Sequence, residues 1–434
     1  MRGHRVPTSL FVQSLLRRAL LPALAATSLV ASVPAGAAAA APFQAPAAAD
    51  RVVSDAAGWL AGQLSSAGTV VGSFPGEDGS AVEFTDWGRS LDSALALLAA
   101  ASQDTLLGRT LTSVEDPAAV AEYTQGAPFD QPDAAYVGAT AKLALVVELT
   151  GGDASSVGGV DLLAQLASLV QDSARFADRS SFGSFANLYG HAFALLALDA
   201  AGSTPDDALV QGLLATQCTD GSFPESYEPA TGGACTGQVD ATGLILQALA
   251  ALDLAAGDPA QQAAQWLSGQ QQADGSFPGE APVNSAGYAV LGLNAVNQPT
   301  QPTVAWLADQ QNADGGLGRG AGEDSSSDLF ATAQALPALA GKSFQDSARV
   351  VARQAVEPTP SPTPVTPTAT PLAAAPAGTG AAQQEPTAAA GSALPRTGID
   401  LADLLLAGGV LLAAGGALTA AARPRRRGRH AAAR

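Results

Sequence analysis

Side chains able to do acid–base chemistry or to hold a ligand gather at the starts of several apolar segments of this sequence. They are Asp86, Trp87, Tyr189, His191, Asp240, Thr242 and Tyr288. If the segments are helices lying side by side, their starts surround one mouth of a central cavity, where helix N-termini favour anions. These residues are therefore a candidate pocket. The interpretation that their types favour, however, is structural: Asp240 caps its helix, while His191 and Tyr288 pack in the core.

Adjacent carboxylates are a second candidate for chemistry, because enzymes that cleave polysaccharides use a pair of them. Such pairs occur in loop-like contexts at Glu77-Asp78, Asp206-Asp207 and Glu323-Asp324. Pairs of this kind are also typical of a solvated surface. Three histidines and two cysteines in 434 residues do not make a zinc-binding cluster, so we expect no metal and no cofactor.

The charge of the chain excludes one class of partner. The formal net charge is −18, and the segment from Arg51 to Glu357 carries 10 basic against 35 acidic residues. A surface of that sign repels phosphate backbones. We therefore expect no nucleic acid partner.

The elements that position the candidate residues form a helical repeat over residues 51–356. Two clear copies share the spacing Trp-x3-Gln-x3-Asp-Gly and begin at Trp266 and Trp306; a third ends at Phe223, and degenerate copies precede Phe74 and Phe185. Each Asp-Gly predicts a turn, with the glycine free to take a positive φ. The segments expected to be buried inner helices, apolar nearly all round, are 90–101, 136–149, 188–201, 240–254, 285–296 and 329–339. Stacked two-helix units of this length predict an all-α fold, an α/α toroid.

This spacing resembles the prenyltransferase and squalene-oxidase type repeat over about 300 residues. The resemblance implies a terpenoid cyclase-like toroid but leaves the activity open. Class II terpene cyclases use an Asp-x-Asp-Asp acid, which is missing here; Val239-Asp240-Ala241-Thr242 is the nearest match. The zinc ligands of prenyltransferases and the Cys-Gly-x-Gln thioester of macroglobulins are also missing. Gln238 to Thr242 is similar to an inner-helix start of cobalamin carriers, which remains an alternative.

The two ends of the chain carry addressing signals. Residues 1–41 have a basic start, an apolar stretch and a run of alanines, which is typical of a secretory signal peptide. At the other end, Leu394, Pro395, Arg396, Thr397 and Gly398 precede an uncharged span over 404–422 and a basic tail over 423–434. The span is long enough for one transmembrane helix, and the tail would stay cytoplasmic.

This order of pentapeptide, span and tail resembles the sorting signal of Gram-positive surface proteins. The resemblance implies that a sortase cleaves between Thr397 and Gly398 and joins the Thr397 carbonyl to an amine of a peptidoglycan precursor. The partners would be the sortase, peptidoglycan and, before sorting, the membrane. Residues 357–393, rich in Pro and Thr, predict an extended disordered stalk across the cell wall.

Export also bears on the two cysteines. An exported domain permits oxidation, and Cys218 and Cys235 bracket a 16-residue loop, so we expect them to form a disulfide. Our leading hypothesis is a secreted, wall-anchored protein whose toroid binds a small lipophilic ligand or a partner protein without catalysis. The alternative is a secreted enzyme of the cyclase or polysaccharide-active type. A deep pocket with two facing carboxylates would favour the enzyme.

Overall fold

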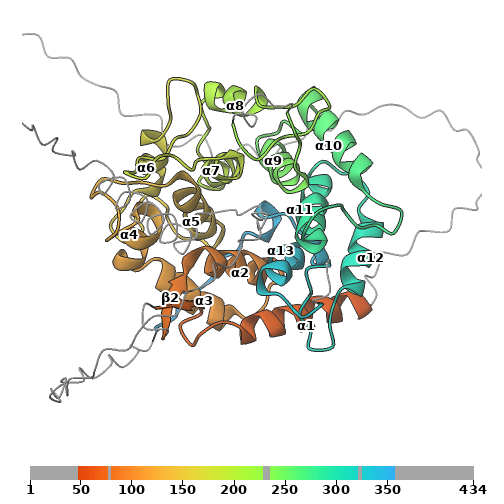
Figure 1. The fold of residues 1–434 in the computed structure, drawn as a ribbon, viewed down its shortest axis with the longest axis horizontal. Coiled ribbons are helices and arrows are strands. Elements are labelled where there is room, and N and C mark those ends of the chain that lie inside the picture. Colours follow the sequence, from red (N-terminus) through yellow and green to blue (C-terminus); the bar gives the residue numbers. More distant parts are fainter. Residues whose placement is uncertain (1–46, 77–79, 228–234, 321–324, 357–434) are drawn as a thin grey trace, which may run out of the picture. The chain divides into compact units, whose positions relative to one another are not determined.

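The computed structural model describes residues 47–76, 80–227, 235–320 and 325–356 (Figure 1). The signal peptide, the stalk, the sorting motif, the 404–422 span and the basic tail all lie outside these ranges, so their assignments stay predictions. Within the described ranges, no helix has both the length and the apolar character needed to cross a membrane.

Six helices form a closed inner ring in the described part of the chain. Each contacts the next along the sequence, and the last returns to contact the first, as the centre of Figure 1 shows. The ring consists of α2 (Trp87–Ala99), α5 (Val137–Leu149), α7 (Leu188–Ala200), α9 (Val239–Ala251), α11 (Pro282–Ala295) and α13 (Leu329–Leu339). The predicted inner helices and the all-α toroid are confirmed.

Outer helices pack around this ring because they have one apolar face and one polar face. They are α1 (Ala47–Gly62), α3 (Asp104–Val114), α4 (Pro117–Gln125), α6 (Leu162–Ser168), α8 (Asp207–Leu214), α10 (Asp258–Gln270) and α12 (Gln301–Asp309). A short 3-10 helix, η1 (Gln345–Ser347), follows α13.

One element differs from the predicted all-helical chain. Strands β1 (Val70–Pro75) and β2 (Ala81–Asp86) form an antiparallel hairpin with Val70 opposite Asp86. Phe74 and Phe84 meet across it with ring centroids 6.0 Å apart. The degenerate repeat copy that ends at Phe74 therefore begins in α1 at Trp59 but ends in a strand, where side chains pair across the hairpin.

Small residues set the close packing of the inner ring. A side chain at Gly243 in α9 would collide with the backbone carbonyl of Tyr288 in α11. Bulkier residues would separate these two helices. The small residues of the inner helices thus allow neighbouring helices to approach closely, and this close packing keeps them buried.

The predicted Asp-Gly turns are also confirmed, and the last of them closes the ring. Gly315 has φ +96°, and a Cβ there would lie 2.7 Å from the carbonyl oxygen of Asp55 in α1. Asp314 accepts a hydrogen bond from the indole of Trp59, at 3.0 Å. The final repeat therefore packs on the first helix, which joins residues more than 250 positions apart.

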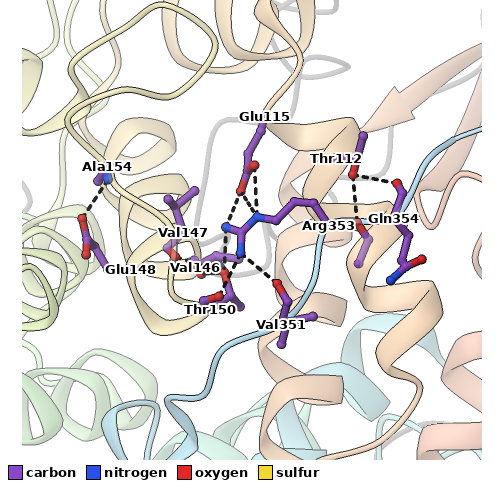
Figure 2. Close-up of polar contacts among 11 residues, drawn as sticks. Thr112, Glu115, Val146, Val147, Glu148, Thr150, Ala154, Val351, Arg353 and Gln354 are labelled. Atoms are coloured by element: carbon purple, nitrogen blue, oxygen red, sulfur yellow. Dashed lines mark hydrogen bonds and ion pairs between the residues drawn. The ribbon is translucent and has the colours of Figure 1, made fainter.

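A C-terminal strap, residues 341–356, crosses the ends of the inner helices. Phe344 stacks on Phe193 of α7 at 6.2 Å and donates its backbone N–H to Gln247 of α9. Farther along, the Arg353 guanidinium donates to Glu115 at 2.6 Å and to the Thr150 carbonyl at 2.8 Å (Figure 2). The strap thus fastens α3, α5, α7 and α9 together at this end of the ring.

Candidate functional site

A cavity of about 380 Å³ opens where α9 and α11 begin. Its volume lies within the range of small-molecule sites. Its wall is completed by the loops before α9, α11 and α13 and by one side of α10. The lining residues are Glu225, Gly237, Gln238, Val239, Asp240, Trp266, Gln270, Pro278, Gly279, Glu280, Ala281, Asn284, Ser285, Arg319 and Phe330.

Asp240 is the buried acid of this cavity and is only 7% exposed. Burial raises its pKa from 3.8 to about 6, and the charge of Glu225 acts in the same direction, while a hydrogen bond from Ser285 opposes both. With this pKa the carboxyl is mostly ionised at pH 7 and takes up its proton in mildly acidic solution. The interpretation that Asp240 caps its helix is wrong, because Gln238 occupies the N-cap position and makes no side-chain cap. Desolvation outweighs the helix dipole here.

Glu225 is a second acid of the site, and the sequence interpretation missed it. Its backbone carbonyl accepts a hydrogen bond from the N–H of Leu188 at 2.9 Å, which holds this loop against the start of α7. Burial raises the pKa of its carboxyl. Burial raises the pKa of the Tyr189 hydroxyl, and the charges of Asp240 and Glu225 add to this effect. That hydroxyl is buried and has no hydrogen-bond partner among the described residues.

Two further polar groups reach the cavity with unused hydrogen-bonding capacity. Asn284 is 3% exposed and donates its amide to Gln334 at 3.0 Å. Its Oδ1 receives no donor from the described residues. Arg319 enters from the loop before α13, held there because its carbonyl accepts the N–H of Val283. Its Nε is buried and finds no acceptor in the described ranges.

The cavity also has apolar surface, chiefly from Trp266 of α10 and Phe330 of α13. The indole of Trp266 donates to the Asp220 carboxylate, which fixes the ring in the wall. Nearby, the structure joins Cys218 to Cys235 in a disulfide with their Cα atoms 5.5 Å apart. This link ties the turn after α8 to the segment that leads into Gly237 and Gln238.

Of the predicted pocket residues only Asp240 lines this cavity; for the others the single-pocket expectation is wrong. Asp86 caps α2 by accepting the N–H of Arg89 at 2.9 Å. The Trp87 indole donates to Glu122 at 3.0 Å. Thr242 accepts the backbone N–H of Phe223 at 3.0 Å, which fixes the chain as it returns from the turn.

The remaining predicted residues lie in the core. His191 is fully buried, contacts the Tyr227 hydroxyl through Nδ1 at 3.1 Å and meets the edge of Phe176. Burial lowers its pKa to about 4, so the ring is neutral. Tyr288 is 3% exposed in α11. The structural interpretation of both residues is confirmed.

The adjacent carboxylates do not gather at the site. Asp206 caps α8 by accepting the N–H of Ala208 at 2.9 Å, and Asp207 is exposed in the first turn of that helix. The pairs Glu77-Asp78 and Glu323-Asp324 lie outside the described residues. The Asp206-Asp207 pair is thus explained by its place at the start of α8, where Asp206 caps the helix.

Comparison with known proteins agrees with this architecture. The family model of the squalene-hopene cyclase C-terminal domain matches residues 233–343, the part that contains α9 to α13. No curated protein sequence is significantly similar to the chain. The type II terpene cyclase MstE from Scytonema superposes with a TM-score of 0.50 at 14% identity, over 68% of this chain and 98% of that one.

Two other solved structures are similar at lower scores. A protein from Actinoplanes has a TM-score of 0.49 at 15% identity, covering 68% of this chain and 99% of its own. An unsaturated glucuronyl hydrolase specific for heparin has a TM-score of 0.45 at 13% identity, covering 67% of this chain and 96% of its own. The chain is thus similar in fold to the type II terpene cyclase, as an α/α toroid of the terpenoid cyclase kind.

Proposed function

We propose that the toroid binds a small molecule in the cavity at the starts of α9 and α11. The observation that carries this proposal is a cavity of about 380 Å³ with the buried side chains of Asp240, Asn284 and Ser285 on its wall. Polar groups buried without a full set of partners cost stability. A ligand that supplies those hydrogen-bond partners therefore gains binding free energy that a purely apolar cavity could not provide.

The wall chemistry describes the ligand in outline. Trp266, Phe330 and Val239 offer apolar contact, while the acids, Asn284 and Arg319 offer polar contact. The ligand has an apolar part and a polar part, in keeping with the lipophilic ligand expected from the sequence. A partner protein and a cobalamin remain alternatives that the experiment below distinguishes by mass.

We further propose that this binding module is displayed on the cell wall. The support is the order of elements in the sequence: a signal peptide over 1–41, a Pro/Thr stalk over 357–393 and the motif from Leu394 to Gly398. A sortase would release Gly398 and transfer the Thr397 acyl group to peptidoglycan. Before that step the 404–422 span would hold the protein in the membrane.

Extraction of the purified protein tests the binding proposal. Small molecules that co-purify are released by denaturation and identified by mass spectrometry. The variant Ala281→Trp fills the cavity, since Ala281 lies on its wall. Ala118→Trp, on an exposed position of α4, is the matched control. We expect a species present with the wild type and the control and lost with Ala281→Trp. Identical extracts from all three proteins contradict the proposal.

A second candidate function is acid–base catalysis in the same cavity. The observation that favours it is a pair of carboxyls, Asp240 and Glu225, that line one cavity and whose pKa values are both raised by burial. The reaction would be that of a cyclase or of a polysaccharide-active enzyme. Turnover of a polyprenyl or polysaccharide substrate that is abolished by Asp240→Asn would establish it. Binding of such a substrate without turnover contradicts it and leaves the binding function intact.

A further inference from the structure

We infer that the ligand of the α9/α11 cavity is a small zwitterion, with an ammonium group and a carboxylate on one apolar skeleton. The inference rests on the proposed binding function and names the class of ligand. It follows from three features of the wall: an uncompensated acidic side, an unpaired guanidinium, and aromatic surface beside them.

The acidic side of the cavity lacks a cation. Glu225, Asp240 and Glu280 all line it, yet none of the ion pairs among the described residues involves any of them. Among the described residues, no cation contributes to the pKa of Asp240 or of Glu225, both of which burial raises. An ammonium group placed here would favour their ionised forms.

Hydrogen-bonding capacity on this side also fits an ammonium. The Oδ1 of the nearly buried Asn284 faces no donor from the described residues. An ammonium has three N–H donors and no acceptor. It can donate to the Asn284 oxygen and to carboxylates on the same cavity wall. A neutral hydroxyl has only one donor and would leave some of these acceptors unused.

The guanidinium of Arg319 favours a negatively charged group on the ligand. Its side chain makes no ion pair with any described residue, and its Nε is buried without an acceptor. A guanidinium presents its N–H groups in a fork that matches a carboxylate. A ligand bearing only an ammonium would leave this donor unsatisfied, and one bearing only a carboxylate would face Asp240, Glu225 and Glu280.

Apolar surface on the same cavity wall accommodates the skeleton. Trp266 and Phe330 are the aromatic residues of the wall. An aromatic face attracts both apolar groups and a nearby cation. An amino acid with an aromatic or large apolar side chain combines all three features.

Three compounds with nearly the same skeleton test the inference on the wild-type protein. Phenylalanine carries both charges, phenethylamine only the ammonium, and 3-phenylpropanoate only the carboxylate. Isothermal titration calorimetry near neutral pH measures each affinity. We expect phenylalanine to bind tighter than either analogue by on the order of tenfold or more, because each analogue loses charge-assisted hydrogen bonds.

Two variants assign the charges to residues. Asp240→Asn should weaken phenylalanine and phenethylamine by on the order of tenfold and leave 3-phenylpropanoate unchanged or tighter. Arg319→Gln should weaken phenylalanine and 3-phenylpropanoate and spare phenethylamine. Arg109→Gln, outside the cavity, is the control and should change none of them.

The outcomes are decisive for the inference and separable from the proposed function. If phenylalanine and one analogue bind with equal affinity, the charged group that this analogue lacks does not contribute to binding. That result overturns the inference. No binding of any of the three compounds also overturns it. If the extracted ligand is uncharged but is still lost with Ala281→Trp, the binding function holds and the zwitterion inference falls.

Discussion

Replacement of the buried acid Asp240 by Asn should stabilise the protein at neutral pH. The folded state holds the pKa of Asp240 at about 6, against about 3.9 in an unfolded chain. A group with a raised pKa in the folded state adds stability at pH values below its pKa in the unfolded chain. That stability is lost as the pH rises through its pKa in the folded state. A shift of about two units corresponds to about 3 kcal/mol at full ionisation. The amide of the variant would avoid this cost and can still accept the hydrogen bond from Ser285.

Denaturant unfolding of both proteins between about pH 4 and pH 8 measures the difference. We expect the two free energies of unfolding to nearly coincide at the acidic end. They should separate as pH rises, with Asp240→Asn more stable by up to about 3 kcal/mol above about pH 7. A difference that does not change with pH, or a variant less stable than the wild type at neutral pH, refutes the argument that burial dominates.

Three other perturbations test different parts of the account. Lys142 and Asp92 form a buried ion pair at 2.8 Å inside the ring. Lys142→Met should cost about 3–5 kcal/mol of stability because it leaves a buried charge, and adding Asp92→Leu should recover most of that loss. Equal destabilisation of the single and the double variant in urea unfolding contradicts this. Thiol labelling of the unfolded, unreduced protein should find neither Cys218 nor Cys235, and reduction should cost about 3 kcal/mol for a loop of this size; two labelled cysteines exclude the disulfide. Thr397→Ala should move the protein from the wall fraction to membrane or medium, and covalent retention in the wall would contradict the sorting proposal.

The ring of helices was accessible from the sequence because its cause is local and repeated. Each inner helix is rich in small and apolar residues and is buried on nearly every side. In three repeats an Asp-Gly places a glycine with positive φ at the same point, at Gly221, Gly275 and Gly315. The segment 136–149, for example, was expected as a helix and occurs as Val137–Leu149. Composition and period were sufficient for these elements.

The site was much less accessible, because its groups meet only through tertiary packing. Glu225 and Arg319 lie in loops, and nothing in their local sequence marks them as neighbours of Asp240. A place in the first turn of a helix lowers the pKa of an acid such as Asp240 through the helix dipole, which is a local effect. Burial, which depends on the whole fold, raises the pKa of Asp240 instead. The strap was missed for a similar reason, since Arg353 contacts residues more than 200 positions earlier.

The difference between local position and tertiary packing also explains why some residues were assigned to the pocket in error. Asp86, Trp87 and Thr242 do lie at inner-helix starts, as expected. Their side chains are occupied by a backbone N–H or by a neighbouring carboxylate. A position at the mouth of a toroid therefore does not by itself place a side chain in the cavity.

The most direct test of the central claim is crystallographic. Crystals soaked with a library of small polar fragments would show which surface of the toroid accepts ligands. The account predicts fragment density in the cavity at the starts of α9 and α11, in contact with Asp240, Asn284 or Arg319. Fragments bound elsewhere on the toroid while this cavity holds only water would contradict it.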